Sequence, residues 1–146
     1  MIREYLFQTI ACVLAIWGFS VLFYVPRKQY GGCIITGTVG WLIYYALVEN
    51  SVHKILACLI AAFVVTELAR SLAVAQKVPS TIFLVIGIFP LVPGTGVYYT
   101  AYYVFMKNAH MAGVKGLETL EASLAIVGGI VLGSTIPKYI IGQKKR

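Results

Sequence analysis

The sequence predicts an all-α polytopic membrane protein with about five transmembrane helices, and three observations support this prediction. Of the 146 residues, 60% are hydrophobic and 12% are charged, about half the charged fraction of an average soluble domain. The mean hydropathy is +0.85. The apolar residues fall into five runs, each close to or above the roughly 17 to 25 residues that a spanning helix needs. Lipid is therefore the expected solvent of the outer face.

Each of the five apolar runs predicts one span. They cover residues 5–25, 32–48, 55–75, 81–106 and 117–141. The second run is short and glycine-rich, which leaves a tilted or re-entrant segment open as an alternative. The first run follows Arg3 like a signal peptide, but no small-x-small cleavage site comes after it, so a retained span is expected. The joins are too short for a soluble domain, and residues 1–146 are predicted to form a single integral membrane domain.

The basic residues predict the orientation of these spans. With five spans and the N-terminus outside, eight basic residues lie inside: Arg27, Lys28, Arg70, Lys77, Lys138, Lys144, Lys145 and Arg146. Four lie outside: Arg3, Lys54, Lys107 and Lys115. The positive-inside rule therefore favours a multi-pass cell-membrane protein with a cytoplasmic C-terminus. The basic residues form no stripe with interleaved aromatics, so lipid headgroups are the expected partner and nucleic acid is not.

The fourth segment carries helix breakers inside an apolar run. It is 26 residues long, or about 39 Å as one helix, which exceeds the roughly 30 Å hydrocarbon core. Pro90 and Pro93 remove two backbone donors, and Gly94 and Gly96 follow. We therefore expect two half-helices, 82–89 and 95–106, broken between Pro90 and Gly94. Such unwound backbone must be buried in protein or line a wet cavity.

The start of the second half-helix is a candidate carboxylate site. A helix N-terminus has partial positive charge and free N–H donors, and broken helices bind anionic groups in several transporters. Thr95 is a candidate N-cap. The predicted substrate-binding residues are Pro90, Pro93, Gly94, Thr95, Gly96, Tyr98 and Thr100. The alternative for the tyrosines of this segment, Tyr98, Tyr99, Tyr102 and Tyr103, is an interfacial aromatic belt.

The third segment contains Glu67, the only acid well inside a predicted span, with Arg70 three positions on. These residues can meet on one helix face. Ionisable residues inside membranes are costly and often functional, so the pair is a candidate for proton coupling or gating. The alternative is a static ion pair near the cytoplasmic end.

No catalytic, metal or cofactor site is predicted. The chain has no aspartate, no HExxH and no GxSxG, so an intramembrane enzyme is not expected. Cys12, Cys33 and Cys58 lie in apolar runs and are interpreted as small packing residues. His53 and His110 lie in joins and are expected at the surface.

Small residues recur at four-residue spacing in two segments. Ala125, Gly129 and Gly133 share one helical face, and Gly32, Thr36 and Gly40 share another. Such faces let helix backbones approach closely in lipid. They predict either packing within the chain or a docking face for another chain, including a homo-oligomer.

Three motifs in order resemble the threonine/serine exporter family, and in particular its short C-terminal module. They are "ELAR" at Glu67 to Arg70, "KVPST" at Lys77 to Thr81, and "PLVPG" at Pro90 to Gly94 with Tyr98 after it. "FYVPRK" also fits, so the similarity touches most of the chain.

The resemblance implies a small subunit of a secondary exporter that works with a larger partner subunit. Full exporters of the family have about ten spans and export small hydroxy amino acids, and related two-chain members are linked to dicarboxylates such as succinate. Export is thought to use the proton gradient. The alternative is a structural or assembly subunit without direct substrate contact.

Overall fold

The computed structural model describes residues 2–136, which are helical except for short turns. The elements are α1 (Ile2–Leu22), η1 (Arg27–Gln29), α2 (Tyr30–Glu49), α3 (Lys54–Gln76), α4 (Ser80–Ile88), η2 (Phe89–Leu91), α5 (Gly94–Phe105) and α6 (Ala109–Thr135). Four helices are long and apolar enough to cross a membrane. The segment α4–η2 and helix α5 form a bent pair, which brings the number of spans to five if the pair counts as one span. The predicted all-α architecture with about five spans is confirmed. Residues 137–141 of the fifth predicted segment, and Lys138, Lys144, Lys145 and Arg146, lie outside the described residues.

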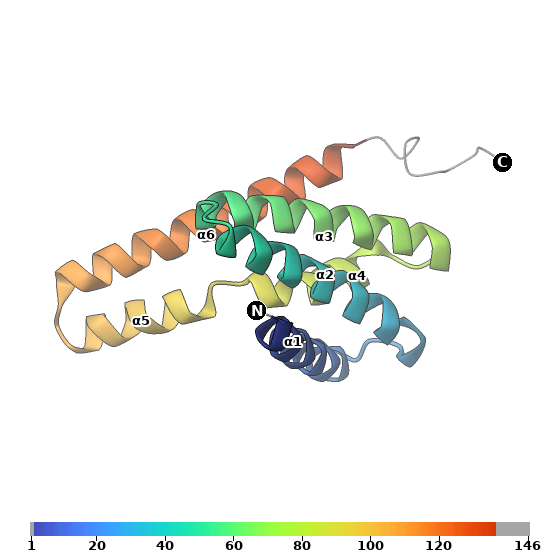
Figure 1. Cartoon of the computed structure of the whole chain (residues 1–146), viewed down its shortest axis with the longest axis horizontal. Helices are drawn as coiled ribbons and strands as arrows, with labels where there is room; N and C mark the ends of the chain where they lie inside the picture. The colour runs from blue at the N-terminus through green and yellow to red at the C-terminus, as the bar shows by residue number, and fades with distance from the viewer. Residues whose placement is uncertain (1, 137–146) are drawn as a thin grey trace.

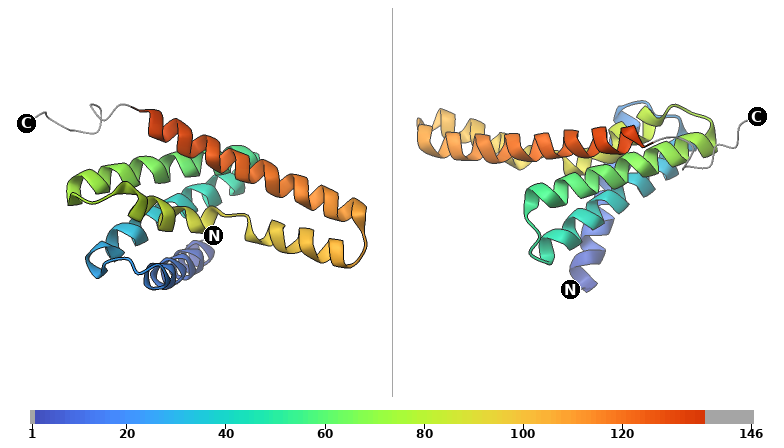
Figure 2. Two further views of the ribbon diagram at one scale, coloured as in Figure 1. Left: turned by 180° about the vertical axis from the view of Figure 1, so that it is seen from behind. Right: turned by 90° about the horizontal axis from the view of Figure 1, so that it is seen from above.

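The helices form two parts of unequal thickness (Figure 1). Helices α1 to α4, η2 and the C-terminal half of α6 pack together, and we call these elements the body. Helix α5 and residues 109–122 of α6 form a hairpin that projects from the body beyond the α2–α3 turn, and we call this hairpin the arm. The arm projects in both views of Figure 2 as well. Helix α5 has no buried residue, and its main neighbour is α6.

Four of the turns share one geometry. A non-glycine residue with φ between 54° and 62° follows α1, α2, α3 and α5: Tyr24, Ser51, Lys77 and Lys107. The next amide then donates to the carbonyl five residues earlier, as from Val78 to Ala73 at 3.1 Å. This Schellman arrangement satisfies carbonyls that the helix end would leave free. It explains how such short joins reverse the chain direction.

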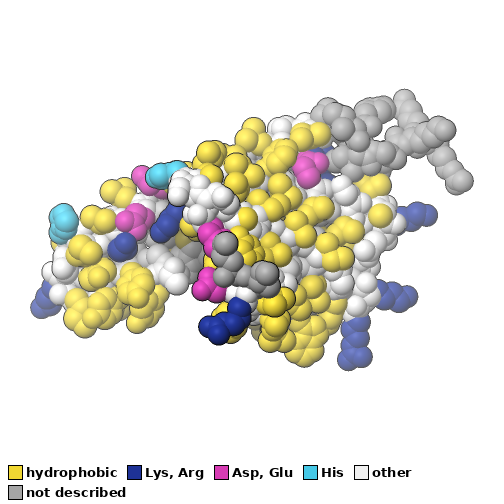
Figure 3. All heavy atoms as spheres, in the orientation of Figure 1, with side chains coloured by type: hydrophobic (Ala, Val, Ile, Leu, Met, Phe, Trp, Pro, Cys, Tyr) yellow, Lys and Arg dark blue, Asp and Glu magenta, His cyan; other side chains and the backbone are white. Residues whose placement is uncertain are grey.

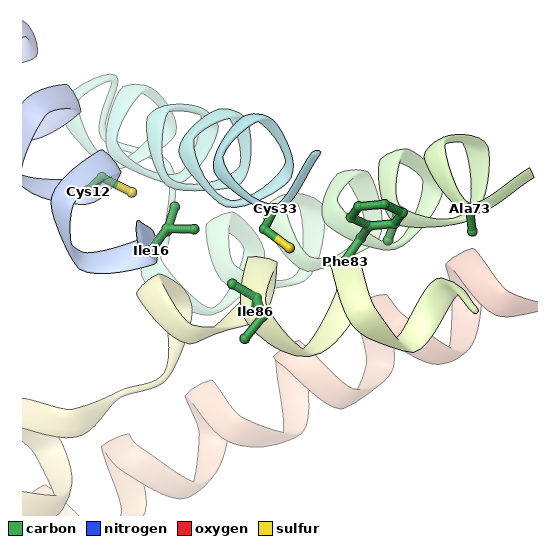
Figure 4. Close-up of a cluster of buried hydrophobic side chains, with 7 residues drawn as sticks. Cys12, Ile16, Cys33, Ala73, Phe83 and Ile86 are labelled. Carbon is green, nitrogen blue, oxygen red and sulfur yellow. The ribbon is translucent and has the colours of Figure 1, made fainter. Parts of the chain in front are cut away.

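The body has two buried apolar clusters. The first lies between α1, α2, α3 and α4, and Figure 4 shows Cys12, Ile16, Cys33, Phe83 and Ile86 pointing toward one another. The second joins α3, η2 and α6: Cys58, Ala61, Ala62, Val65, Leu91, Ala125 and Ile126. All three cysteines are buried in these clusters, as expected of small packing residues.

The small-residue faces lie at contacts within the chain. A Cβ on Gly129 would come within 2.8 Å of the Ala62 Cβ on α3, and one on Gly133 within 2.8 Å of the Thr66 Cβ. In α2, Gly32 packs against Phe83 and Gly40 against Val65. These glycines bring α6 and α2 against their neighbours, which supports the packing interpretation of both faces.

One predicted segment boundary, the start of the fifth segment, was wrong. Helix α6 begins at Ala109 rather than near 117, because Asn108 caps it: the Asn108 side chain accepts a hydrogen bond from the Met111 amide at 3.1 Å. Hydropathy marks the apolar part of a helix and misses such a polar first turn. Helix α2 extends from Tyr30 to Glu49 as one continuous 20-residue helix, so the second segment is neither short nor interrupted.

Candidate functional site

A cleft of about 910 Å³ lies where the arm meets the body. Its walls come from three places: the end of α2 with the α2–α3 turn, the break between η2 and α5, and the arm portion of α6. The lining residues include Trp41, Tyr44, Ser51, His53, Lys54, Cys58, Pro90, Pro93, Gly94, Thr95, Gly96, Lys115, Glu118, Thr119 and Glu121. Five of the seven predicted substrate-binding residues are among them.

The break is shorter than the sequence predicts. Pro90 lies in the 3₁₀ turn η2, so one more turn of helical backbone continues past α4. Only Val92, with extended backbone, and Pro93 lie outside a helix, and the two halves are bent by 53°. The Gly94 amide donates to the Val92 carbonyl at 2.7 Å. Proline tolerates the first turn of a helix, which explains why Pro90 does not unwind η2.

The N-terminus of α5 leaves backbone donors facing the cleft. The Val97 amide donates to the Pro93 carbonyl at 3.2 Å, but the Thr95 and Gly96 amides have no hydrogen-bond partner within residues 2–136. Both residues line the cleft. The expected N-cap role of Thr95 is wrong, because Pro93 occupies the N-cap position and no side chain caps the helix. Helix α5 starts one residue earlier than predicted, which places Thr95 inside its first turn.

Charged side chains line the cleft on both sides. His53 and Lys54 come from the α2–α3 turn and the start of α3, whereas Lys115, Glu118 and Glu121 come from α6. Lys115 Nζ donates to a Glu118 carboxylate oxygen at 2.8 Å. The site prediction missed all five, because they lie in polar joins or at a predicted span edge, where charge signals only an exposed end. No group of three or more potential metal ligands occurs in the described part of the chain.

Two aromatic side chains of α2 line the body side of the cleft. The ring centroids of Trp41 and Tyr44 lie 5.5 Å apart. The indole N–H of Trp41 donates to the side-chain oxygen of Gln8 on α1 at 3.3 Å. Helix α1 therefore orients the aromatic wall although it does not itself line the cleft.

Tyr98 and Thr100 do not line this cleft. Thr100 is half-buried on the face of α5 that contacts Gly116 of α6, and its hydroxyl donates to the Gly96 carbonyl at 2.7 Å. Tyr98 is 64% exposed and stacks on Tyr102, with ring centroids 6.4 Å apart. Residues two positions apart lie on different faces of a helix, so one cavity does not accommodate both side chains.

Glu67 and Arg70 lie away from the cleft, where α3 meets the end of α6. Arg70 Nη1 contacts a Glu67 carboxylate oxygen at 2.9 Å. The same guanidinium donates to the Gly133 carbonyl, and Nη2 donates to the Ile136 carbonyl at 2.6 Å. Cations are favourable at a helix C-terminus because the last carbonyls lack partners there. Arg70 therefore ties α3 to α6, and Glu67 holds its guanidinium.

The comparisons with known proteins agree with the membrane architecture. The family model described as "Threonine/Serine exporter, ThrE" matches residues 8–136. Comparisons with the curated proteins and with the solved structures find no match. The matched region covers α1 from residue 8 onward, all the other described helices and the whole cleft.

Proposed function

The chain belongs to the threonine/serine exporter family, and from this premise we propose that it is the small subunit of a secondary exporter for small carboxylate-bearing metabolites. Family membership and the apolar helices make it a multi-pass membrane protein of transporter type rather than an enzyme. The proposed substrates are threonine and serine, or dicarboxylates such as succinate. The proposed driving force is the proton gradient.

The observation that carries the proposal is the pair of free amides at the cleft. The Thr95 and Gly96 amides lie in the first turn of α5, within an apolar segment of the sequence, and Lys54 lines the same cleft. Free amides and a cation are the groups that bind a carboxylate. Glu121 also lines the cleft and suits an ammonium group. An amino acid has both charges, so threonine and serine match this lining better than a dicarboxylate does.

We assign gating to Glu67 and Arg70 and substrate contact to the cleft residues. The pair holds α3 against the end of α6, while the other half of α6 provides one wall of the cleft. Release of these contacts would let the C-terminal end of α6 shift relative to α3. Protonation of Glu67 would weaken its attraction to Arg70, which is a route from the proton gradient to the gate.

The proposed partner is a larger exporter-family membrane subunit in the cell membrane. The cleft is only partly enclosed by this chain, and none of the residues of α5 is buried. A larger subunit packed along the arm would close the cleft and complete the substrate site. Tyr98, on the exposed face of α5, would reach such a composite site only across this interface.

The test is export of threonine and of succinate from cells that carry Gly94→Leu. Gly94 lines the cleft, and a Cβ added there would meet no atom within 4 Å, so the backbone tolerates a side chain at this position and leucine would occupy part of the cleft. Gly113→Leu is the matched control, because Gly113 has equally open space and does not line the cleft. We expect Gly94→Leu to lower export about tenfold, equivalent to about 1.4 kcal/mol, and Gly113→Leu to preserve it. Unchanged export by Gly94→Leu at normal expression would instead favour an assembly subunit without substrate contact.

A further inference from the structure

The two sides of the cleft carry charges of opposite sign that are not yet paired. The body side presents His53 and Lys54, and the arm side presents Glu118, Glu121 and Lys115. Lys115 is already paired with Glu118, which leaves Glu121 as the free acid of the arm side. Within residues 2–136 neither Lys54 nor Glu121 makes an ion pair. Figure 3 shows charged side chains gathered around the hollow between the arm and the body.

The arm is attached to the body in a way that permits it to move as one unit. Its two helices are held together where Gly96 packs against Thr119 and where Thr100 packs against Gly116. By contrast, α5 joins the body only through the non-helical residues Val92 and Pro93.

The other connection of the arm to the body is α6 itself. This helix is continuous from Ala109 to Thr135, and Ala125 and Ile126 are already buried in the second cluster of the body. Gly129, further along, is fixed against α3. The arm therefore has one non-helical link to the body, at Val92 and Pro93, and one continuous helix, which would bend near residue 122 when the arm moves.

We propose that the arm closes on the body and that pairing of Lys54 with Glu121 drives this closure. Attraction between opposite charges increases as their separation falls, and water is excluded from the narrowing cleft. Closure would bring the arm portion of α6 against the α2–α3 turn and reduce the volume of the cleft. This pairing belongs to the empty cleft, because the proposed amino-acid substrate would itself engage Lys54 and Glu121.

Disulfide trapping on the purified full-length chain in lipid vesicles tests the closure. The pair Ser51→Cys and Thr119→Cys places one thiol on each side of the cleft and leaves every charge intact. The native cysteines Cys12, Cys33 and Cys58 are first replaced by alanine. The control pair combines Ser51→Cys with His110→Cys, which lies in the first turn of α6 at the far end of the arm. After oxidation, loss of reaction with a maleimide-linked polymer measures the disulfide.

We expect the cleft pair to form its disulfide at least about tenfold faster than the control pair, because a disulfide requires Cα atoms within about 7 Å. Lys54→Glu or Glu121→Lys should each slow trapping about three- to tenfold, and the double reversal should restore it, as coupled charges do in double-mutant cycles. Lys107→Glu, at the tip of the arm, should have no effect. Equal trapping in both pairs, or slowing that the double reversal does not rescue, would overturn the proposal. If a single charge reversal slowed trapping by disturbing the fold, adding the second charge reversal would not restore the trapping rate.

Discussion

At the scale of single residues, adjacent glycines of α6 have different surroundings. A Cβ on Gly129 would lie 2.8 Å from the Ala62 Cβ and 2.9 Å from the Phe63 amide nitrogen, and it would also contact the Leu59 carbonyl. Much of this neighbourhood is backbone, which cannot rotate away as a side chain can. A Cβ on Gly128 would meet only the end of the Leu59 side chain, at 3.9 Å. An alanine at position 129 therefore tests close packing between helices, and an alanine at position 128 tests helix propensity alone.

We predict that Gly129→Ala lowers the free energy of unfolding by about 1–3 kcal/mol, because overpacking forces α6 away from α3. Gly128→Ala should instead raise it by up to about 1 kcal/mol, because the site is open and alanine has the higher helix propensity. Denaturant unfolding of the purified chain in detergent, followed by circular dichroism, measures both. Similar losses in the two variants would mean that Gly129 does not lie at the helix contact.

At the scale of elements, Arg70 links the C-terminal third of α3 to the last turn of α6. Arg70→Met removes the donors to the Gly133 and Ile136 carbonyls. Loss of a hydrogen bond to a charged group costs about 1.5–3 kcal/mol, so amide exchange at the end of α6 should accelerate more than tenfold. Glu67→Gln leaves those donors in place and should have a smaller effect. Hydrogen exchange with mass spectrometry distinguishes the two, and equal effects would contradict the role of Arg70 as a helix cap.

A second prediction at this scale concerns the crossing of α5 and α6. A Cβ on Gly96 would contact the Thr119 hydroxyl and lie 3.2 Å from the Thr119 Cβ. Since α5 packs mainly on α6, Gly96→Ala should loosen α5 and speed amide exchange over residues 98–105 about tenfold, equivalent to about 1.4 kcal/mol. Gly94→Ala is the control, because its Cβ would meet nothing within 4 Å. Unchanged exchange in Gly96→Ala would show that α5 does not rely on this contact.

Local chemistry explains which elements could be predicted from the sequence. Pro90 and Pro93 act on their own backbone, so the break followed from two residues and their missing donors. The start of α6 did not follow, because the capping side chain of Asn108 lies in a stretch that hydropathy treats as a join. The contribution of Pro90 was overestimated for the related reason that a 3₁₀ turn accommodates it.

At the scale of the whole molecule, one segment of the cleft lining could be predicted from the sequence. The other two parts of the lining come together only through the packing of distant helices. Gly94, Thr95 and Gly96 belong to a single stretch, and the sequence pointed to them together. Lys54 and Glu121 are 67 positions apart and line the same cleft only because α3 packs along α6. No periodicity relates them, so their common location required the tertiary structure.

The topology of the whole chain rests on whether the bent pair crosses the membrane. Lys77 lies in the turn after α3 and Lys107 in the turn after α5, and the bent pair lies between them. Both residues are exposed, both have φ of 55°, and both occupy the same kind of turn. They are therefore matched labelling sites, and the proposed five-span topology places them on opposite sides of the membrane.

We predict that a membrane-impermeant maleimide labels Lys107→Cys in intact cells and labels Lys77→Cys only after permeabilisation. The native cysteines are replaced by alanine in both variants. This result is expected for five spans with the N-terminus outside, since basic residues concentrate on the cytoplasmic side. The reverse labelling pattern would mean that the bent pair crosses the membrane in the opposite orientation. Labelling of both sites from the same side would make the bent pair a re-entrant segment, and the cleft at its break would then open to that side alone.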